Sequence, residues 1–403
     1  MNILEGLSLC EFTPKEEIDR RILRLKEEME KSDIGISIIL QNVDIFYFSG
    51  TLQKSILLIP IEGDPLLLVE KNVERAKVES PIDQIPIRND REAKKHIERY
   101  VKKGMRCGME LDVIPVSLLR RLEEIVGGLE IADISRTIRE IRAIKSEFEI
   151  SQIKKSGKIV SLVFEEAKAY VREGEREIDI AARLESIGRM NGHQGILRMR
   201  GLNQEMMNIY VIHGISATIP SFGDVPISGC GVTPAVAQGP SLNRIKRGVP
   251  TLIDYGGAYN GYITDETRIF LIGEWGHDLF RKGYECAYEI ITEVEGLGKD
   301  GVCATEIFEK ALSIAKRHGL RQNFMGHGET KVSFIGHGLG LEINELPVIT
   351  GRHRTILKEG MVFAFEPKFV FPCLGASGLE VDFIVRKWGL ERVTDFPLDV
   401  VRL

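Results

Sequence analysis

Two aspartates lie eleven residues apart in a glycine-rich stretch, Asp254 and Asp265 in L-I-D-Y-G-G-A-Y-N-G-Y-I-T-D-E-T-R. The pattern predicts a buried strand over residues 251–254, a hairpin turn rich in glycine and then a second strand. Such a hairpin would bring the two carboxylates side by side, where they repel each other unless a cation lies between them. That cation can be a proton or a metal ion.

Three further residues with ligand chemistry interrupt or end apolar runs. His337 lies in F-I-G-H-G-L-G-L-E, where glycines on both sides let the backbone approach closely. Glu366 ends the apolar run M-V-F-A-F-E-P, directly before a proline that breaks strand pairing. Glu380 begins another predicted strand in S-G-L-E-V-D-F. Each side chain is therefore expected at the edge of a core, pointing into it.

Four carboxylates and one imidazole form a hard, oxygen-rich set of ligands. A single zinc site usually needs three or four ligands with nitrogen or sulfur prominent, whereas five mostly anionic ligands suit a pair of divalent ions. Two of the carboxylates would bridge the ions, which lie about 3.5–4 Å apart in such centres. A shared water becomes a hydroxide near neutral pH, and both ions can polarise the scissile carbonyl.

The elements that must position these residues lie in the second part of the chain. A charged segment over residues 136–146 leads into a long amphipathic helix, and it marks the predicted boundary between domains 1–140 and 141–403. The pattern after this boundary predicts helices packed against a mostly antiparallel sheet, an α+β arrangement. The further helices are expected at 175–191, 276–294 and 303–319, and the closing strands at 332–336, 361–365, 379–386 and 391–393.

Within residues 1–140, helical and strand patterns alternate as in an α/β layer. The sequence shows no cluster of His, Cys or acidic residues with ligand spacing there, so the predicted role is architectural, or to wall one side of a site built elsewhere. Helices are expected at 14–31, 91–102 and 116–126, and strands at 36–40, 45–48, 55–61, 66–69, 105–110 and 129–134.

The composition excludes several classes of partner. The chain has 54 Lys and Arg against 59 Asp and Glu, and no basic block could follow a phosphate backbone, so no nucleic-acid partner is expected. The N-terminus lacks the features of a signal peptide and the apolar runs are too short to span a bilayer, so a cytoplasmic location without membrane contact is predicted. Six scattered cysteines suggest neither a disulfide framework nor a cysteine zinc site.

In these motifs the chain resembles the pita-bread metallohydrolase family, which includes prolidase, aminopeptidase P, methionine aminopeptidase and the metal-free creatinase. The likeness runs from about residue 141 to the C-terminus and begins at R-A-I-K-S-E-F-E-I-S-Q-I. The segment N-V-D-I-F-Y-F-S-G is similar to part of the smaller creatinase/prolidase N-terminal domain. The resemblance implies an α/β domain of that kind followed by a pita-bread catalytic domain.

The resemblance also implies roles for the five residues. Asp254 would bind one divalent ion, Asp265 and Glu380 would bridge two ions, and the second ion would be bound by His337 and Glu366. In peptidase relatives the glutamate at the position of Glu366 also moves the proton from the bridging water to the leaving amine. The ions implied are Mn, Co, Zn or Fe, and the sequence does not choose among them.

Several positions depart from the pattern of the peptidases. Asn344 stands where they have a histidine seven residues after the ligand His337, and Ser333 stands where aminopeptidase P has another. Leu379 replaces an arginine, and the loop before Asp254 lacks the usual histidine. Such histidines bind the substrate carbonyl and stabilise the oxyanion, and losing one donor costs about 10²–10³ in rate.

The segment 198–233 replaces a short connection of the family and contains R-M-R-G and Y-V-I-H-G. We hypothesise that His213, Arg198 or Arg200 enters the metal cleft and contacts the substrate, together with Asn344. The alternative is that His213 is a satisfied structural histidine and that the arginines pair at a subunit interface.

Three functions remain open from the sequence. The leading one is a dinuclear metal-dependent peptidase, an Xaa-Pro dipeptidase or aminopeptidase that cleaves short peptides with Glu366 as general base. The second is hydrolysis of a small amide or amidine, or a lyase step on a small carboxylate. The third is a non-enzymatic binding protein.

The resemblance also implies an assembly, a homodimer in which the N-terminal domain of one subunit closes the cleft of the other. Residues 42–51 are a candidate for that contact, with a core strand as the alternative.

Overall fold

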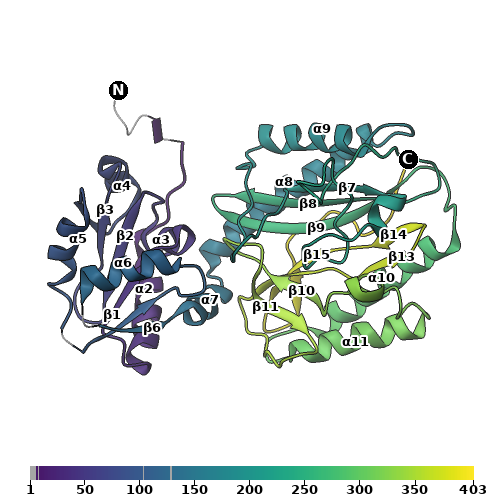
Figure 1. Cartoon of the computed structure of the whole chain (residues 1–403). Helices are drawn as coiled ribbons and strands as arrows, with labels where there is room; N and C mark the ends of the chain where they lie inside the picture. Colours follow the sequence, from purple (N-terminus) through teal and green to yellow (C-terminus); the bar gives the residue numbers. More distant parts are fainter. Residues whose placement is uncertain (1–5, 8, 103, 128) are drawn as a thin grey trace. The chain divides into compact units, whose positions relative to one another are not determined.

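The computed structural model describes residues 6–7, 9–102, 104–127 and 129–403 (Figure 1). The chain splits into two compact units. The first extends to Arg142 and includes Gly201–Asn203, and the second comprises Ala143–Arg200 and Gln204–Leu403. The division predicted after residue 140 lies two residues before the end of the first long segment.

The first unit is built on a six-stranded sheet with the order β4-β3-β2-β1-β5-β6. The central strands β1, β2 and β3 pair antiparallel, as the predicted hairpin requires, and the outer strands join in parallel. The strands are β1 (Ile36–Ile39), β2 (Ser55–Pro60), β3 (Leu66–Val69), β4 (Asp83–Pro86), β5 (Arg106–Met109) and β6 (Glu130–Asp133). The helices are α2 (Lys15–Lys31), α3 (Asn42–Ser49), α4 (Val73–Glu79), α5 (Asp90–Ile97), α6 (Val116–Val126) and α7 (Ser135–Ala143).

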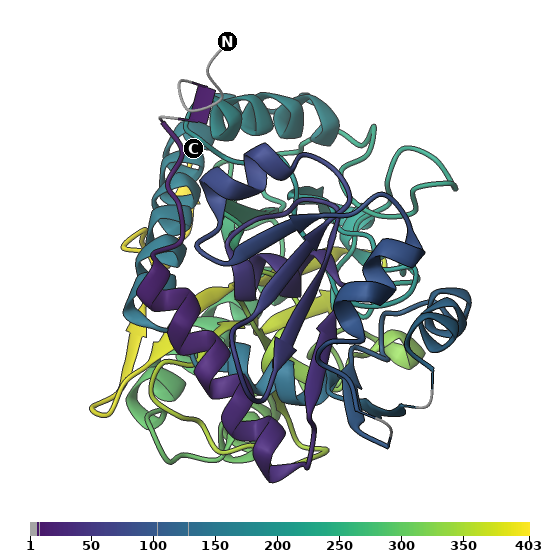
Figure 2. The same ribbon diagram turned by 90° about the vertical axis from the view of Figure 1, so that its left-hand side faces the viewer.

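Helices cover both faces of this sheet, because its strands are apolar on both faces. Alternate residues such as Ile38, Leu58 and Leu68 pack with α5 and α6 in one core cluster. Figure 2 shows α2 in purple on the opposite side of the strands from α5 and α6. The predicted α/β layer is thus confirmed as a three-layer unit.

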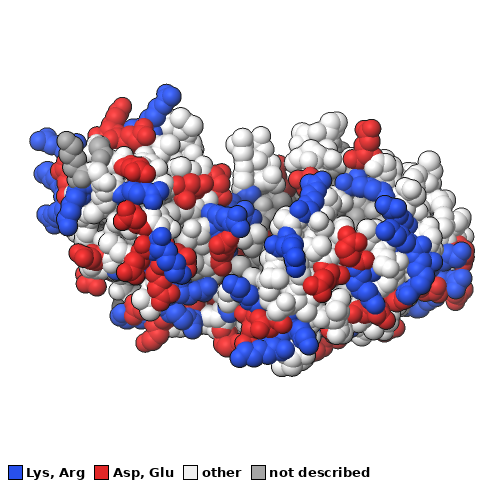
Figure 3. Space-filling model, turned by 90° about the horizontal axis from the view of Figure 1, so that it is seen from below, with Lys and Arg blue, Asp and Glu red and all other residues white. Residues whose placement is uncertain are grey.

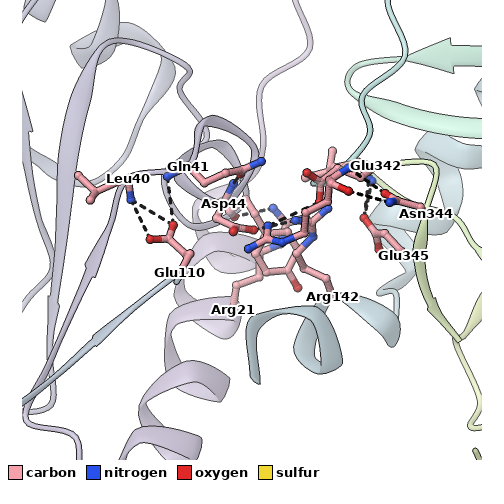
Figure 4. Close-up of polar contacts among 12 residues, drawn as sticks. Arg21, Leu40, Gln41, Asp44, Glu110, Arg142, Glu342, Asn344 and Glu345 are labelled. Atoms are coloured by element: carbon pink, nitrogen blue, oxygen red, sulfur yellow. Dashed lines mark hydrogen bonds and ion pairs between the residues drawn. The ribbon is translucent and has the colours of Figure 1, made fainter. Parts of the chain in front are cut away.

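Two buried acidic side chains of the first unit have hydrogen-bond partners within it (Figure 4). The Glu110 carboxylate accepts hydrogen bonds from the backbone N–H groups of Leu40 and Gln41, each at 3.1 Å. Asp44 and Arg142 form a buried ion pair at 2.7 Å. These contacts fix the start of α3 against the ends of β1 and β5.

The strand predicted over residues 45–48 is wrong, because this segment forms the helix α3. The Gln41 side chain accepts from the N–H of Asp44 and caps the helix, and Gly50 ends it with a φ of 79°. The alternative of a core strand for residues 42–51 is wrong for the same reason. The charged segment 136–146, expected as a connection, also contains a helix, α7.

The second unit places helices on either side of antiparallel sheets (Figure 1). Helices α8 and α9 pack on the four-stranded sheet β17-β9-β8-β7, and α10 and α11 pack on the strands of the other half. The helices are α8 (Glu147–Tyr170), α9 (Glu177–Met190), α10 (Asp278–Leu297) and α11 (Ala304–Arg317). The strands are β7 (Ile209–His213), β8 (Thr251–Tyr259), β9 (Tyr262–Leu271), β10 (Phe334–Gly338), β11 (Glu345–Thr350), β12 (Val362–Phe365), β13 (Lys368–Phe371), β14 (Gly375–Gly378), β15 (Val381–Val385), β16 (Leu390–Arg392) and β17 (Val401–Arg402). The predicted α+β pita-bread fold is confirmed.

The hairpin of β8 and β9 differs from the predicted one in where it turns. The first strand does not end at Asp254 but continues to Tyr259, and the turn falls at Asn260 and Gly261, which have φ values of 48° and 88°. Two successive positive φ values are typical of the type I′ turn, which suits Asn-Gly. The glycines before the turn lie inside the strand, where Gly257 lets α8 approach the sheet.

Charged side chains of both signs are interspersed on the face drawn in Figure 3. Across the described residues, no helix combines the length and the apolar character needed to cross a membrane.

Candidate metal centre

The five predicted ligands line one cavity of about 240 Å³, and every residue of its lining belongs to the second unit. They come from five elements: Asp254 from β8, Asp265 from β9, His337 from β10, Glu366 from the end of β12 and Glu380 from the start of β15. The structure thus brings together residues more than 100 positions apart in the sequence. Their role as metal ligands stays a prediction.

The register of the hairpin explains why the two aspartates meet. Asp254 pairs with Thr267, and Asp265 pairs with Gly256, two residues further along β8. Residues two apart on a strand share a face, so the carboxylates are diagonal neighbours on one face of the hairpin. The backbone N–H of Asp265 donates to Asp382 Oδ2 at 2.8 Å and fixes this position.

The glycines beside His337 allow the strands around it to come close. A Cβ on Gly336 would lie 2.3 Å from the carbonyl oxygen of Ala364 in β12. A Cβ on Gly338 would lie 2.1 Å from the carbonyl oxygen of Leu346 in β11. Only glycine fits where the backbones come this close. The two glycines therefore allow β10 to lie tightly between β11 and β12, and this places the imidazole of His337 at the cavity.

A lysine that the sequence analysis missed lies among the predicted ligands. The ammonium nitrogen of Lys368 contacts three of the four carboxylates, and its distances are 2.9 Å to Asp254, 3.1 Å to Glu366 and 2.7 Å to Glu380. Its residue type does not mark it as a ligand, because a lysine ammonium has no lone pair for a metal ion. Its signal was present, because a lysine inside the apolar run F-E-P-K-F-V-F must find buried partners.

Burial and charge act in opposite directions on these groups. Burial disfavours the charged form of Lys368, but the carboxylates of Asp254, Glu380 and Glu366 outweigh it and hold the pKa of this lysine well above its usual value. Burial, followed by the charges of Glu380 and Asp254, raises the pKa of Asp265 well above the ordinary range. The centre therefore has more negative charge than one ammonium balances.

The residues fit a divalent cation at one position. Asp265, His337 and Glu380 offer ligand atoms that all lie within 4.8 Å of one another. Within the described part of the chain, the buried Oδ1 atoms of Asp254 and Asp265 have no hydrogen-bond partner. Unpaired buried carboxylate oxygens favour a bound cation, and carboxylate with imidazole is a donor set that divalent metals accept.

The wall of the cavity comes largely from the segment 198–233, but not from the residues predicted there. Its contribution consists of Met199, Gln204, Met206, Tyr210, Asp224, Val225 and Ile227. Phe334, Ile343 and Val348, from β10, β11 and the loop between them, add apolar surface to the lining. Most of these residues lie in loops or near strand ends without a periodic pattern, so no local signal in the sequence marks them as lining a cavity.

His213 does not enter the cavity, which corrects its predicted placement. The side chain is buried at the end of β7, where Nδ1 is 2.9 Å from Thr251 Oγ1 and Nε2 accepts from the backbone N–H of Lys246 at 2.9 Å. Burial, with a smaller contribution from the charge of the nearby Lys246, lowers the pKa of His213 to about 4. The residue is a satisfied structural histidine, which was the stated alternative.

Arg198 and Arg200 also lie outside the set of described residues that line the cavity. The guanidinium of Arg200 is buried 3.7 Å from the Glu342 carboxylate. Asn344 does line the cavity, but its amide group accepts from the backbone N–H of Arg200 at 2.9 Å and donates to the carbonyl oxygen of the same residue at 2.8 Å (Figure 4). Neither arginine therefore lies among the cavity residues, where it was predicted to contact the substrate.

Ser333 stands where aminopeptidase P has a histidine, and Leu379 stands where the peptidases have an arginine. Both residues lie next to strands that position predicted ligands. The carbonyl oxygen of Ser333 accepts from the Thr350 hydroxyl at 2.7 Å, just before β10. Leu379 is fully buried in the core cluster under β12 and β15. The described residues of the cavity lining include neither.

A pita-bread fold around buried carboxylates and one imidazole defines the class of the pita-bread metallohydrolases. The comparison with protein families agrees with this class. The chain belongs to metallopeptidase family M24, whose model matches residues 151–387. The model of the creatinase/prolidase N-terminal domain matches residues 21–144. The predicted family, fold and enzyme class, a metal-dependent peptidase, are thus confirmed.

The relatives of the chain cover nearly its whole length. It is similar to the Xaa-Pro dipeptidase of Pyrococcus furiosus, with 29% identity over 93% of this chain and 97% of that protein. Among solved structures it resembles the prolidase of Pyrococcus horikoshii, with 26% identity, a TM-score of 0.79 and coverage of 94% and 100% of the two chains. It also resembles an X-Pro aminopeptidase from Thermotoga maritima, with 25% identity, a TM-score of 0.78 and coverage of 95% and 99%.

Proposed function

We propose that this protein hydrolyses short peptides at the bond before a proline. The observation that carries the proposal is the meeting of Asp254, Asp265, His337, Glu366 and Glu380 in one cavity of a family M24 chain. The names of the similar proteins from Pyrococcus and Thermotoga support proline at the scissile bond.

The lining of the cavity suits a small peptide. Its volume of about 240 Å³ lies just below the about 300–1,000 Å³ of most small-ligand sites, which favours a short substrate over a long peptide. Besides the predicted ligands and other polar residues such as Gln204 and Asp224, the lining contains apolar side chains that could hold a prolyl ring. These apolar residues are Met199, Met206, Val225, Ile227, Phe334, Ile343 and Val348.

In this proposal the predicted ligands hold divalent metal and Glu366 moves the proton. Metal bound at the carboxylates would supply an activated water and polarise the peptide carbonyl. The Glu366 carboxylate lines the cavity beside the other acidic groups, where it can take a proton from water and pass it to the leaving amine. Asn344 stays a candidate for contact with substrate, through the part of its side chain that faces the cavity.

The test is hydrolysis of a peptide panel by the full-length protein reconstituted separately with Mn²⁺, Co²⁺ or Zn²⁺. We expect cleavage of Xaa-Pro dipeptides or tripeptides and not of matched peptides with alanine in place of proline. Glu366→Gln should lower kcat by at least about 10², because it removes the general base. The metal that gives the highest activity also addresses the identity of the ion.

Glu177→Gln is the matched control for this prediction. Glu177 is an equally buried carboxylate of the second unit that accepts from the backbone N–H of His213 and Ser241, away from the cavity lining. Its variant should keep the turnover number of the folded protein. Cleavage of no peptide by metal-loaded protein contradicts the proposed function.

A specific observation favours a second candidate, hydrolysis of a small non-peptide amide or amidine, or a lyase step on a small carboxylate. The amide of Asn344 is bonded at both ends to the backbone of Arg200, and His213 lies outside the cavity. Asn344 and His213, the side chains that could take over the role of the peptidase histidines, thus form hydrogen bonds with other parts of the protein. Turnover of such compounds without cleavage of peptides would support this candidate.

We also propose a homodimer, as the resemblance implies, and a cytoplasmic location, as the sequence pattern predicts. Light scattering coupled to size-exclusion chromatography measures the mass of the assembly, and a monomer contradicts the proposed dimer. Residues 42–51 remain the candidate contact, now as the helix α3 with the residues that flank it.

A further inference from the structure

Lys368 lies inside the group of predicted metal ligands, although an ammonium cannot bind a metal ion. Its nitrogen is within 3.1 Å of oxygens from Asp254, Glu366 and Glu380. An ammonium has three donor hydrogens and no lone pair. It therefore uses the carboxylate oxygens that a metal ion would need, and the two cations compete for the same place.

The structure holds the lysine firmly in this position. Lys368 pairs with Gly378 across β13 and β14, and a Cβ on Gly378 would lie 2.7 Å from the Cα and 3.0 Å from the Cγ of Lys368. The glycine thus makes room for the lysine stem. The carbonyl oxygen of Lys368 accepts from the backbone N–H of Met325 at 2.9 Å on the other side. With 4% of its side chain exposed, the lysine is enclosed by the fold rather than lying over the cavity from the surface.

Lys368 contacts two of the three residues expected at the first ion, Asp254 and Glu380, and two of the four expected at the second, Glu366 and Glu380. Asp254 is the residue expected to bind the first ion and not the second, and its Oδ2 atom contacts the ammonium. The Oε2 atom of Glu380 also contacts the ammonium and accepts from the Thr267 hydroxyl at 2.8 Å. The described structure shows no contact of this kind between Lys368 and either Asp265 or His337.

The second position remains suitable for a metal ion. Asp265, His337 and Glu380 can direct one ligand atom each to a common point. The Oδ1 atom of Asp265 is buried and, among the described residues, has no hydrogen-bond partner. One ion at this point would satisfy that oxygen without displacing the ammonium.

We propose that Lys368 replaces the ion that Asp254 would bind. The chain then binds one divalent ion, held by Asp265, His337 and Glu380, beside a permanent ammonium. This inference rests on the proposed function only in taking the centre to bind metal. It changes the expected chemistry, because a substrate would meet one metal ion and one ammonium in place of two metal ions.

The test counts the ions bound to the full-length chain. Protein incubated with excess Mn²⁺ and desalted is analysed for metal content by mass spectrometry, and EPR spectroscopy distinguishes an isolated Mn²⁺ ion from an exchange-coupled pair. We expect one Mn²⁺ per chain and the spectrum of an isolated ion. Lys368→Met keeps most of the side-chain volume but releases Asp254 and Glu366, so it should bind two ions with the spectrum of a coupled pair.

Lys145→Met is the matched control. Lys145 is a lysine of the same unit with 1% of its side chain exposed. Its ammonium lies 3.0 Å from Glu345, which is not one of the five predicted ligands. This variant should still bind one ion. Two ions in the unchanged chain overturn the inference. A single ion in Lys368→Met that is folded by circular dichroism overturns it as well.

This proposal and the proposed function can fail separately. A chain that binds one ion but cleaves no peptide contradicts the function and leaves the role of Lys368 intact. A chain that binds two ions and cleaves peptides contradicts the role of Lys368 alone. Binding of no ion contradicts both.

Discussion

At the scale of single residues, His213 shows how burial converts a histidine into a structural group. Both ring nitrogens have partners within the protein, Thr251 and the backbone of Lys246. In the neutral imidazole one nitrogen donates and the other accepts, and this matches the accepting role of Nε2 here. Protonation would place a second donor against the N–H of Lys246, so the folded protein resists it.

We predict that His213 makes the second unit less stable in acid. Its pKa is lowered to about 4 in the folded protein from an ordinary value of 6.5, so the unfolded chain binds the proton first as the pH falls. The stability it contributes is complete above pH 6.5 and decreases by about 3 kcal/mol as the pH falls toward 4. His213→Gln, which keeps an acceptor for Lys246, should remove this part of the pH dependence.

Urea unfolding between pH 4 and 7.5 measures this effect. Both tryptophans, Trp275 and Trp388, lie in the second unit, so their fluorescence follows its unfolding. His353→Gln, at an exposed histidine, is the control and should leave the profile unchanged. Identical pH profiles for His213→Gln and the unchanged chain would refute the prediction. Peptide turnover at pH 7.5 should not depend on His213, since the residue is outside the cavity.

At the same scale, the sequence predicted which acidic residues and which histidine come together in one cavity, but not their neighbours. Asp254, Asp265, His337, Glu366 and Glu380 were selected by residue type and by their places at the ends of apolar runs, which geometry then brings together. The partners of these side chains could not be found in that way. Contacts such as those of Lys368 depend on the crossing of strands that are remote in sequence, and local patterns do not contain that information.

At the scale of elements, close packing of α8 on the β8–β9 hairpin depends on Gly257. A Cβ on this residue would lie 2.6 Å from Val160 Cγ2 and 2.8 Å from Ser156 Oγ, both in α8. It would also lie 2.5 Å from Thr264 Oγ1 in β9. These distances are too short for real contacts, so the helix or the hairpin would have to shift. The hairpin carries both aspartates of the centre.

We predict that Gly257→Ala destabilises the second unit by about 1–3 kcal/mol, the usual cost of overpacking. Gly296→Ala is the matched control, because Gly296 lies in α10 and nothing is within 4 Å of the added Cβ. That control should stabilise the helix slightly, by up to about 1 kcal/mol. Urea midpoints followed by tryptophan fluorescence compare the two variants. Equal midpoints would show that α8 adjusts without cost.

The same scale explains which elements the sequence predicted. Long periodic helices such as α2 and α9 were predicted close to their observed bounds, because their apolar stripes repeat over several turns. The short helix α3 was predicted as a strand, since eight residues with apolar side chains nearly all round show no clear period. Its capping by Gln41 and its end at Gly50 were the signals that could have corrected the assignment.

At the scale of the whole molecule, the predicted ligands all belong to the second unit. Metal binding should therefore stabilise that unit and protect its strands, with no direct effect on the sheet of the first unit. At a metal concentration a hundred times Kd, the gain in free energy of unfolding is about 2.7 kcal/mol.

Hydrogen exchange followed by mass spectrometry checks this prediction. Addition of Mn²⁺ should slow exchange in peptides from β8, β9, β10, β12 and β15 and leave β1–β6 unchanged. In Asp265→Asn, which lacks one predicted ligand charge, the protection should be weaker. Equal protection of both sheets would contradict the restriction of the effect to the second unit.

The fold class of each unit could be predicted from the sequence, but the assignment of individual segments to the two units could not. Alternating patterns before residue 140 and helices with antiparallel strands after it were enough to give both fold classes. The return of Gly201–Asn203 to the first unit was not predicted, because nothing in the composition of R-G-L-N marks a change of unit.

The ammonium of Lys368 is a counter-ion attached to the polypeptide, and this has a consequence for the protein before it meets any metal. Soluble ions can be diluted, removed by a chelator or exchanged for competitors, whereas the lysine is present at a fixed place as soon as the strands come together. The newly folded chain therefore brings Asp254, Glu366 and Glu380 together with one positive charge already between them. Formation of this part of the acidic cluster depends on the synthesis of the chain and not on the supply of metal in its surroundings.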